Sequence, residues 1–126
     1  MIFIVDDDRS VRTSLTRLMR SADYEARAFA SAEEYLRDGE WARAGAGCVI
    51  LDLHMPGMSG LQVLQQLRLA KVPLPAVVIT AYDEPSTRDE CLAAGAAAYL
   101  RKPLDERLLL NAISATVRLI PKENNR

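Results

Sequence analysis

Five short apolar runs recur along this chain, and each is followed by a segment whose apolar residues have helical spacing. The runs cover residues 2–5, 24–29, 48–51, 76–79 and 97–100. The run at 48–51 has no polar face, which predicts a strand covered on both sides, as in a parallel sheet. Strands that alternate with helices across short connections favour parallel pairing, right-handed crossovers and helices on both faces. The sequence therefore predicts an α/β fold, a doubly wound parallel sheet of five strands.

The helical segments carry their own start and stop signals. Residues 31–34, Ser-Ala-Glu-Glu, have the form of a capping box that opens a helix. Pro85 suits a first helical position, and we expect that helix to end near Gly95. The second apolar run is the weakest strand, because Glu25 and Arg27 interrupt it, so we expect it at an edge of the sheet. Apolar residues at helical spacing mark three further helices: Val11, Leu15 and Leu18; Leu61, Leu64 and Leu67; and Leu109, Ile113, Val117 and Ile120.

Length and charge restrict what the chain can be. Its 126 residues suit one domain, which we expect over residues 1–120, with a polar tail or the start of a linker over 121–126. The 16 Lys and Arg residues are balanced by 17 Asp and Glu residues, so the charge gives no support for direct nucleic-acid binding. No apolar stretch approaches the ~20 residues of a membrane span, and the first apolar run is too short for a signal peptide, so we expect a cytoplasmic protein. Cys48 and Cys91 lack metal-ligand spacing and are interpreted as reduced packing residues.

Polar residues stand at the ends of four of the five predicted strands. The run 6–8, three aspartates, follows the first strand, Asp52 the third and Thr80 the fourth, and Lys102 comes shortly after the fifth. Because the carboxyl ends of parallel strands share one edge of a sheet, these side chains should converge where ligands gather. Carboxylates in one cleft repel each other unless a cation is present, and oxygen ligands favour Mg²⁺. Carboxylate, Mg²⁺, ammonium and hydroxyl groups together predict phosphoryl transfer onto an aspartate.

The same residues carry a resemblance to a known family. Four motifs occur in order: Val5-Asp6-Asp7, residues 51–60 (LDLHMPGMSG), Ile79-Thr80-Ala81, and residues 95–103 (GAAAYLRKP). Over nearly its whole length the chain resembles the receiver domain of two-component response regulators. The resemblance implies the flavodoxin-like (βα)5 fold with strand order 2-1-3-4-5. It also implies a phosphoacceptor signalling domain that assists its own phosphorylation and dephosphorylation, and not an enzyme with a separate substrate.

The resemblance implies a role for each residue around the acceptor. Asp52 would be the phosphoacceptor and a metal ligand. Asp7 would bind Mg²⁺ directly, and Asp6 would act mainly through a metal-bound water. The third protein ligand would be the main-chain carbonyl of His54, so we expect its imidazole to be an exposed loop group. Asp8 is interpreted as the N-cap of the first helix.

Further residues would bind the phosphoryl group or respond to it. Lys102 would hold the phosphoryl group, and Pro103 would follow a cis peptide bond. Thr80 and Tyr99 would be a switch pair that changes the face formed by the fourth helix, fifth strand and fifth helix, and Ala81 would leave the phosphate accessible. The implied partners are a sensor histidine kinase or phosphotransfer protein, docking on the first helix, and a second copy that forms a homodimer through the switched face on phosphorylation.

Some features depart from the family pattern. Leu104 stands where the family often has phenylalanine, a change of little consequence. Ala97 and Ala98 stand where one DNA-binding subfamily has acidic residues that pair across its dimer. This departure argues against that particular dimer for this chain.

Three other interpretations compete with the receiver. A Mg²⁺-dependent phosphatase of the haloacid dehalogenase type also uses an aspartate at a strand end. Such enzymes resemble Asp-x-Asp-x-Thr, and here His54 stands where the second aspartate would be. They also usually carry a cap domain, for which 126 residues leave no room. A pseudo-receiver that binds partners without phosphorylation is disfavoured by the complete set of acidic, hydroxyl and lysine residues. A dinucleotide-binding domain would need Gly-x-Gly-x-x-Gly after the first strand, and that motif does not occur there.

Overall fold

Five parallel strands form one sheet in the part of the chain that this computed structural model describes, residues 1–43 and 47–118. The strands are β1 (Ile2–Val5), β2 (Ala26–Phe29), β3 (Cys48–Asp52), β4 (Ala76–Thr80) and β5 (Ala98–Arg101). Their spatial order is β2-β1-β3-β4-β5, and all four pairings are parallel. The predicted flavodoxin-like fold and its strand order 2-1-3-4-5 are confirmed.

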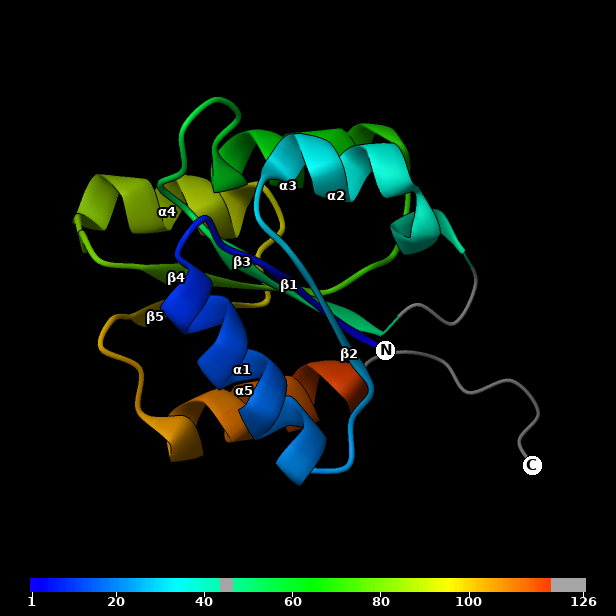
Figure 1. Ribbon diagram of the computed structural model, residues 1–126. Helices are drawn as coiled ribbons and strands as arrows, with labels where there is room; N and C mark the ends of the chain where they lie inside the picture. The colour runs from blue at the N-terminus through cyan, green and yellow to red at the C-terminus, as the bar shows by residue number, and fades with distance from the viewer. Residues whose placement is uncertain (44–46, 119–126) are drawn as a thin grey trace.

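Helices cover both faces of the sheet. Figure 1 shows α1 (Arg9–Ser21) and α5 (Glu106–Arg118) on one face, and α2 (Ala32–Asp38), α3 (Gly60–Leu69) and α4 (Pro85–Ala93) on the other. A short 3-10 helix, Glu40–Ala42, follows α2. Two apolar cores result, one on each face, because successive residues of a strand point to opposite sides. In β1, for example, Ile2 and Ile4 pack beneath α1 and α5, whereas Phe3 and Val5 pack beneath the other three helices.

The burial of each strand follows its place in the sheet. Every residue of β1, β3 and β4 is buried, as the continuous apolar sequences predict. Strand β2 lies at the edge, as predicted, and exposes Arg27 and Ala28. The Arg27 guanidinium lies 2.7 Å from a carboxylate oxygen of Asp38 and 2.6 Å from one of Glu40, so that charges of α2 and the 3-10 helix cover the exposed strand.

The bounds of the strands differ slightly from those predicted. Strand β2 begins at Ala26 and not at residue 24, whereas β3 and β4 each run one residue further than their apolar runs. Asp52 and Thr80 are therefore the last residues of regular strands, held by the sheet's hydrogen bonds. Ile120, predicted as part of the last helix, and the predicted tail 121–126 lie outside the described residues. In the described part of the chain, none of the helices is long and apolar enough to cross a membrane.

Side chains cap four helices at their N-termini, among them α5, where Asp105 accepts from the N–H of Leu108 (3.1 Å). Asp8 accepts hydrogen bonds from the backbone N–H groups of Ser10 (2.8 Å) and Val11 (3.4 Å), which confirms it as the N-cap of α1. The predicted capping box at residues 31–34 forms only in part: Ser31 caps α2, but the Glu34 side chain accepts from the N–H of Ala30 and not of Ser31. A complete capping box, which we did not predict, joins Ser59 and Gln62 at the start of α3.

Candidate functional site

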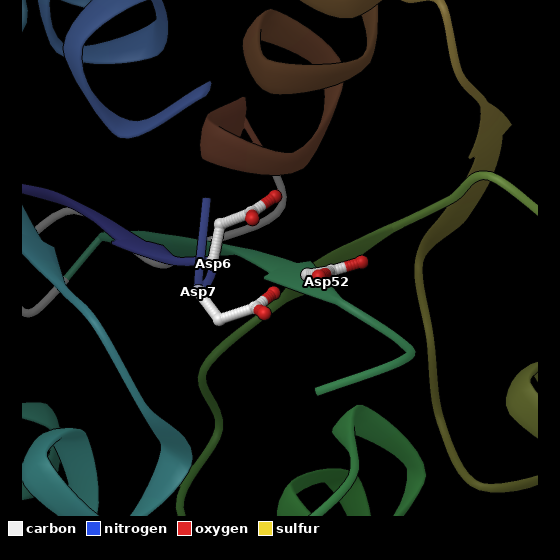
Figure 2. Close-up of side chains that lie close together, drawn as sticks. All are labelled: Asp6, Asp7 and Asp52. Atoms are coloured by element: carbon white, nitrogen blue, oxygen red, sulfur yellow. The ribbon is translucent and has the colours of Figure 1, made fainter. Parts of the chain in front are cut away.

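Three carboxylates meet at the carboxyl ends of β1 and β3. Figure 2 shows Asp6 and Asp7, which directly follow β1, beside Asp52, the last residue of β3. Each residue contributes one oxygen to a group in which all oxygens lie within 4.8 Å of one another. Asp6 and Asp52 are buried, whereas Asp7 is exposed to solvent. The predicted convergence of acidic residues at this edge is therefore present.

Lys102 lies among these carboxylates. Its Nζ atom is 2.9 Å from Oδ2 of Asp6 and 3.5 Å from Oδ1 of Asp52. The residue is positioned by its own backbone, because its N–H donates to the carbonyl of Thr80 (2.7 Å), and the predicted cis peptide bond joins it to Pro103. Burial lowers the pKa of Lys102, but its hydrogen bond to Asp6 and the charge of Asp52 outweigh burial, so the pKa is raised and the ammonium form is favoured.

Asp52 is difficult to ionise in this setting. Burial raises its pKa to about 7, and the charge of Asp6 acts in the same direction, whereas Lys102 opposes the shift. One lysine thus does not compensate the negative charge of three carboxylates. The oxygen donors, their spacing and their excess of negative charge fit a hard divalent cation such as Mg²⁺.

Asp6 and Asp7 differ in how many protein groups they bind. Both carboxylate oxygens of Asp6 accept hydrogen bonds, Oδ1 from the N–H of Asp8 (2.8 Å) and Oδ2 from Lys102. The Asp6 carbonyl also accepts from Arg12 (2.9 Å). Asp7 is exposed to solvent, and Figure 2 shows its carboxylate close to Asp52. All three carboxylates lie close enough together to share one cation, so the assignment of Asp7 as a direct ligand stays a prediction.

Thr80 and Tyr99 lie on one face of the sheet, beneath α4. Tyr99 is the register partner of Val78 in the parallel pair of β4 and β5, and Val78 points to the same side as Thr80. The Thr80 hydroxyl donates to the carbonyl of Tyr82 (3.1 Å) and accepts from its N–H (3.0 Å). The Tyr99 ring is buried, and Arg88 lies over it at 5.5 Å. Among the described residues, the buried Tyr99 hydroxyl has no hydrogen-bond partner.

His54 and Tyr82 stand at the rim of the site on neighbouring loops. His54 is exposed, as predicted, and its ring lies 5.2 Å from the ring of Tyr82 in an edge-to-face arrangement. Tyr82, 66% exposed, was not predicted as part of the site. The signal that could have identified it is a large aromatic residue two positions after Thr80, in a loop at the same edge of the sheet.

A second contact that we did not predict reaches the site from α2. Glu33 accepts a hydrogen bond from the backbone N–H of Met58 (2.9 Å), in the loop that follows β3. This hydrogen bond lowers the pKa of Glu33. Gly60 brings the start of α3 against the same strand, because a Cβ there would lie 2.5 Å from the Asp52 carbonyl oxygen. The loop after Asp52 is thus held by groups on α2 and α3.

Comparison with known proteins adds independent observations. The family model of the response regulator receiver domain matches residues 2–114. The response regulator protein TodT of Pseudomonas putida is 36% identical over 125 residues, which are 99% of this chain and 54% of that relative. The solved structure of the response regulator StyR is 39% identical with a TM-score of 0.86, covering 94% of this chain and 59% of that one. The FixJ-N crystal structure is 30% identical with a TM-score of 0.86, covering 96% and 95%. The chain spans about half the length of the curated relatives it matches.

Proposed function

Because this chain belongs to the response regulator receiver domain family, we propose that it accepts a phosphoryl group on Asp52 and so acts as a switch in two-component signal transduction. The observation that carries the proposal is the position of Asp52, which ends β3 between two further carboxylates and the Lys102 ammonium. A haloacid dehalogenase-type phosphatase and a dinucleotide-binding domain are set aside, since the family match covers most of the chain.

The donor would be a phosphohistidine of a sensor histidine kinase or phosphotransfer protein. A bond forms between a carboxylate oxygen of Asp52 and phosphorus, and the phosphorus–nitrogen bond of the donor breaks, leaving the imidazole to take up a proton. The donor's docking surface would be the apolar hollow between α1 and α5, which is lined by Val11, Leu15, Leu18, Leu104 and Leu109 and borders Lys102. This hollow supports the expectation that α1 takes part in docking.

The residues around Asp52 have separable tasks. Lys102 would pair with a phosphoryl oxygen, since its ammonium already lies 3.5 Å from Asp52. Asp7, Asp52 and the His54 carbonyl would hold Mg²⁺, with Asp6 acting through a water. Mg²⁺ would neutralise the carboxylates and the developing phosphoryl charge. The domain is proposed as a phosphoacceptor and not as an enzyme with turnover of a separate substrate.

The proposed output is a change of the face formed by α4, β5 and α5. Thr80 would turn its hydroxyl toward the phosphoryl group, and Tyr99 would follow into the space vacated. Helix α4 suits such a change because Cys91 is its one buried residue, so few packing contacts hold it in place. The changed face would bind a second copy or another partner of a cytoplasmic signalling pathway, without contacting nucleic acid itself.

The test is incubation with Mg²⁺ and a small-molecule phosphodonor, followed by intact mass measurement. The wild-type chain should gain one phosphoryl group that is stable in acid and labile in base. Asp52→Asn should gain none, and Asp8→Asn serves as a control that changes an aspartate with a purely capping position. Continued single labelling of Asp52→Asn would place the acceptor elsewhere.

A further inference from the structure

Glu33 connects α2 to the loop between β3 and α3. Its Oε2 atom accepts the hydrogen bond from the N–H of Met58, 25 residues further along the chain, at 2.9 Å. Both α2 and α3 lie on the same face of the sheet, side by side (Figure 1), so the first turn of α2 stands next to this loop. The hydrogen bond from Met58 lowers the pKa of Glu33, as expected for a bond made to the carboxylate form.

Gly57 makes this approach possible. Its φ angle of +80° is a left-handed conformation that residues with a side chain rarely adopt. A Cβ at Gly57 would also lie 2.6 Å from Oε2 of Glu33, which is closer than such atoms can approach. Gly57 therefore has two effects: it allows the tight turn of the loop, and it leaves room for the Glu33 carboxylate that binds Met58.

The contact holds a part of the loop that is otherwise free of hydrogen bonds. At one end, the N–H of Leu53 donates to the carbonyl of Ile79 (2.9 Å), and the N–H of Gly60 donates back to Leu53 (3.0 Å). At the other end, the Ser59–Gln62 capping box fixes the start of α3. Among the described residues, the bond to Glu33 is the one hydrogen bond made by the backbone of residues 54–58.

We infer that Glu33 is a positioning residue for the metal side of the phosphoacceptor site. The segment that it holds contains His54, four residues before Met58, and this inference rests on the proposed function, in which the His54 carbonyl is a Mg²⁺ ligand. With Glu33 in place, the loop has less conformational freedom to lose when the carbonyl meets the ion. Without it, the ion must order the loop itself, so that its apparent affinity falls. Glu33 touches neither the ion nor the phosphoryl group.

Three variants separate this role from a general effect of charge. Glu33→Ala removes the hydrogen-bond acceptor, and Glu33→Gln keeps an acceptor but removes the charge. Glu34→Ala removes the same charge one residue further along the same turn of α2, where the carboxylate accepts from Ala30 and not from the loop. Three quantities are measured for each: amide hydrogen exchange at Met58 without metal, the Mg²⁺ dissociation constant by calorimetry, and the Mg²⁺ dependence of Asp52 labelling by a small phosphodonor.

We expect Glu33→Ala to speed exchange at Met58 and to weaken Mg²⁺ binding about threefold, in keeping with the modest net value of one solvent-exposed hydrogen bond. Labelling should need more Mg²⁺ but reach the wild-type rate at saturation, whereas a folding defect would lower the saturated rate. Glu33→Gln should stay close to wild type, as should Glu34→Ala.

Wild-type Mg²⁺ affinity in Glu33→Ala would overturn the inference. So would equal losses in Glu33→Gln and Glu34→Ala, because those would show an effect of charge alone. The proposed function fails separately, if the wild-type chain itself neither binds Mg²⁺ nor is labelled at Asp52.

Discussion

The Nζ atom of Lys102 lies 2.9 Å from Oδ2 of Asp6, and this ion pair joins the end of β1 to the loop after β5 across the mouth of the site. The Asp6 side chain is fully buried, whereas that of Lys102 is 21% exposed. A buried carboxylate that loses its partner is left with the desolvation cost of its charge. Lys102 therefore has two roles that can be measured separately. It stabilises the unphosphorylated domain, and in the proposed function it takes part in the phosphorylation of Asp52.

The first prediction concerns that ion pair. Without Mg²⁺, Lys102→Met should lower the free energy of unfolding by about 2 kcal/mol, less than the ~3–5 kcal/mol of fully enclosed pairs because Lys102 reaches solvent. Asp6→Asn should largely remove this sensitivity, so a double-mutant cycle monitored by urea unfolding should give a coupling of about 1 kcal/mol or more. Lys71→Met, in the exposed turn that follows α3, is the matched control and should change stability little. Additive effects of the Asp6 and Lys102 variants would mean that the pair does not form in solution.

The second prediction concerns the two aspartates after β1. Asp7→Asn should weaken Mg²⁺ binding about tenfold, equivalent to about 1.4 kcal/mol, because an exposed carboxylate free to coordinate is lost. Asp6→Asn should weaken it less, because both Asp6 oxygens are already engaged with Asp8 and Lys102. Calorimetric titration with Mg²⁺ measures both. Equal affinities in the two variants, unchanged from wild type, would place the ion elsewhere.

The third prediction concerns pH in the absence of metal. The pKa of Asp52 is raised to about 7 in the folded chain from its ordinary value of 3.8, so between about pH 4 and pH 7 the folded state binds a proton that the unfolded state has released. Stability contributed by this group is therefore fully present below pH 4 and is lost as the pH rises toward 7. Asp52→Asn should melt about 5 °C higher than wild type at pH 8 and close to wild type at pH 4.5.

Thermal unfolding of the metal-free proteins across this pH range measures the effect. Saturating Mg²⁺ should reduce the difference at pH 8, because the ion binds the ionised form of the folded chain. A constant difference between Asp52→Asn and wild type at every pH would contradict the raised pKa.

The sequence predicts the scaffold well because its signals are local. The unbroken apolar run before Asp52 requires a strand covered on both faces, and Pro85 at the first position of α4 follows from its missing N–H and fixed φ. The convergence of Asp6, Asp52 and Lys102 follows in turn, since parallel strands bring their carboxyl ends to one edge.

What the sequence did not predict depends on distances between elements. The Glu33–Met58 bond needs α2 and α3 at a particular separation, and no local pattern encodes that separation. The contact of His54 with Tyr82 likewise joins loops after two different strands. The capping box of Ser59 and Gln62 is different, because its Ser-x-x-Gln signature is local and is present in the sequence. The similar sequence at residues 31–34 forms only half of a capping box, because Glu34 accepts from the N–H of Ala30 and not of Ser31. The sequence pattern alone therefore does not determine whether the second hydrogen bond of a capping box forms.

The last prediction concerns the hydroxyl of Thr80. The hydroxyl donates to the carbonyl of Tyr82 and accepts from the Tyr82 N–H, so it can donate to a phosphoryl group only by giving up its bond to the carbonyl. We expect the loss of this bond to loosen the loop that leads from β4 into α4. A ligand shifts such an equilibrium only through different affinities for the two arrangements, and the hydroxyl supplies that difference.

Two substitutions test this with matched shape. Thr80→Val keeps the branched side chain but lacks the hydroxyl, whereas Thr80→Ser keeps the hydroxyl. Both should still be labelled at Asp52. Beryllofluoride, which mimics the acyl phosphate, should change hydrogen exchange in α4 of the wild type and of Thr80→Ser, and leave it nearly unchanged in Thr80→Val. Tyr99→Ala should also lose the response, and Thr80→Val/Tyr99→Ala should be little worse than either single variant, because both residues act on the same step. A wild-type response of α4 in Thr80→Val would show that the acceptor communicates with this helix by another route.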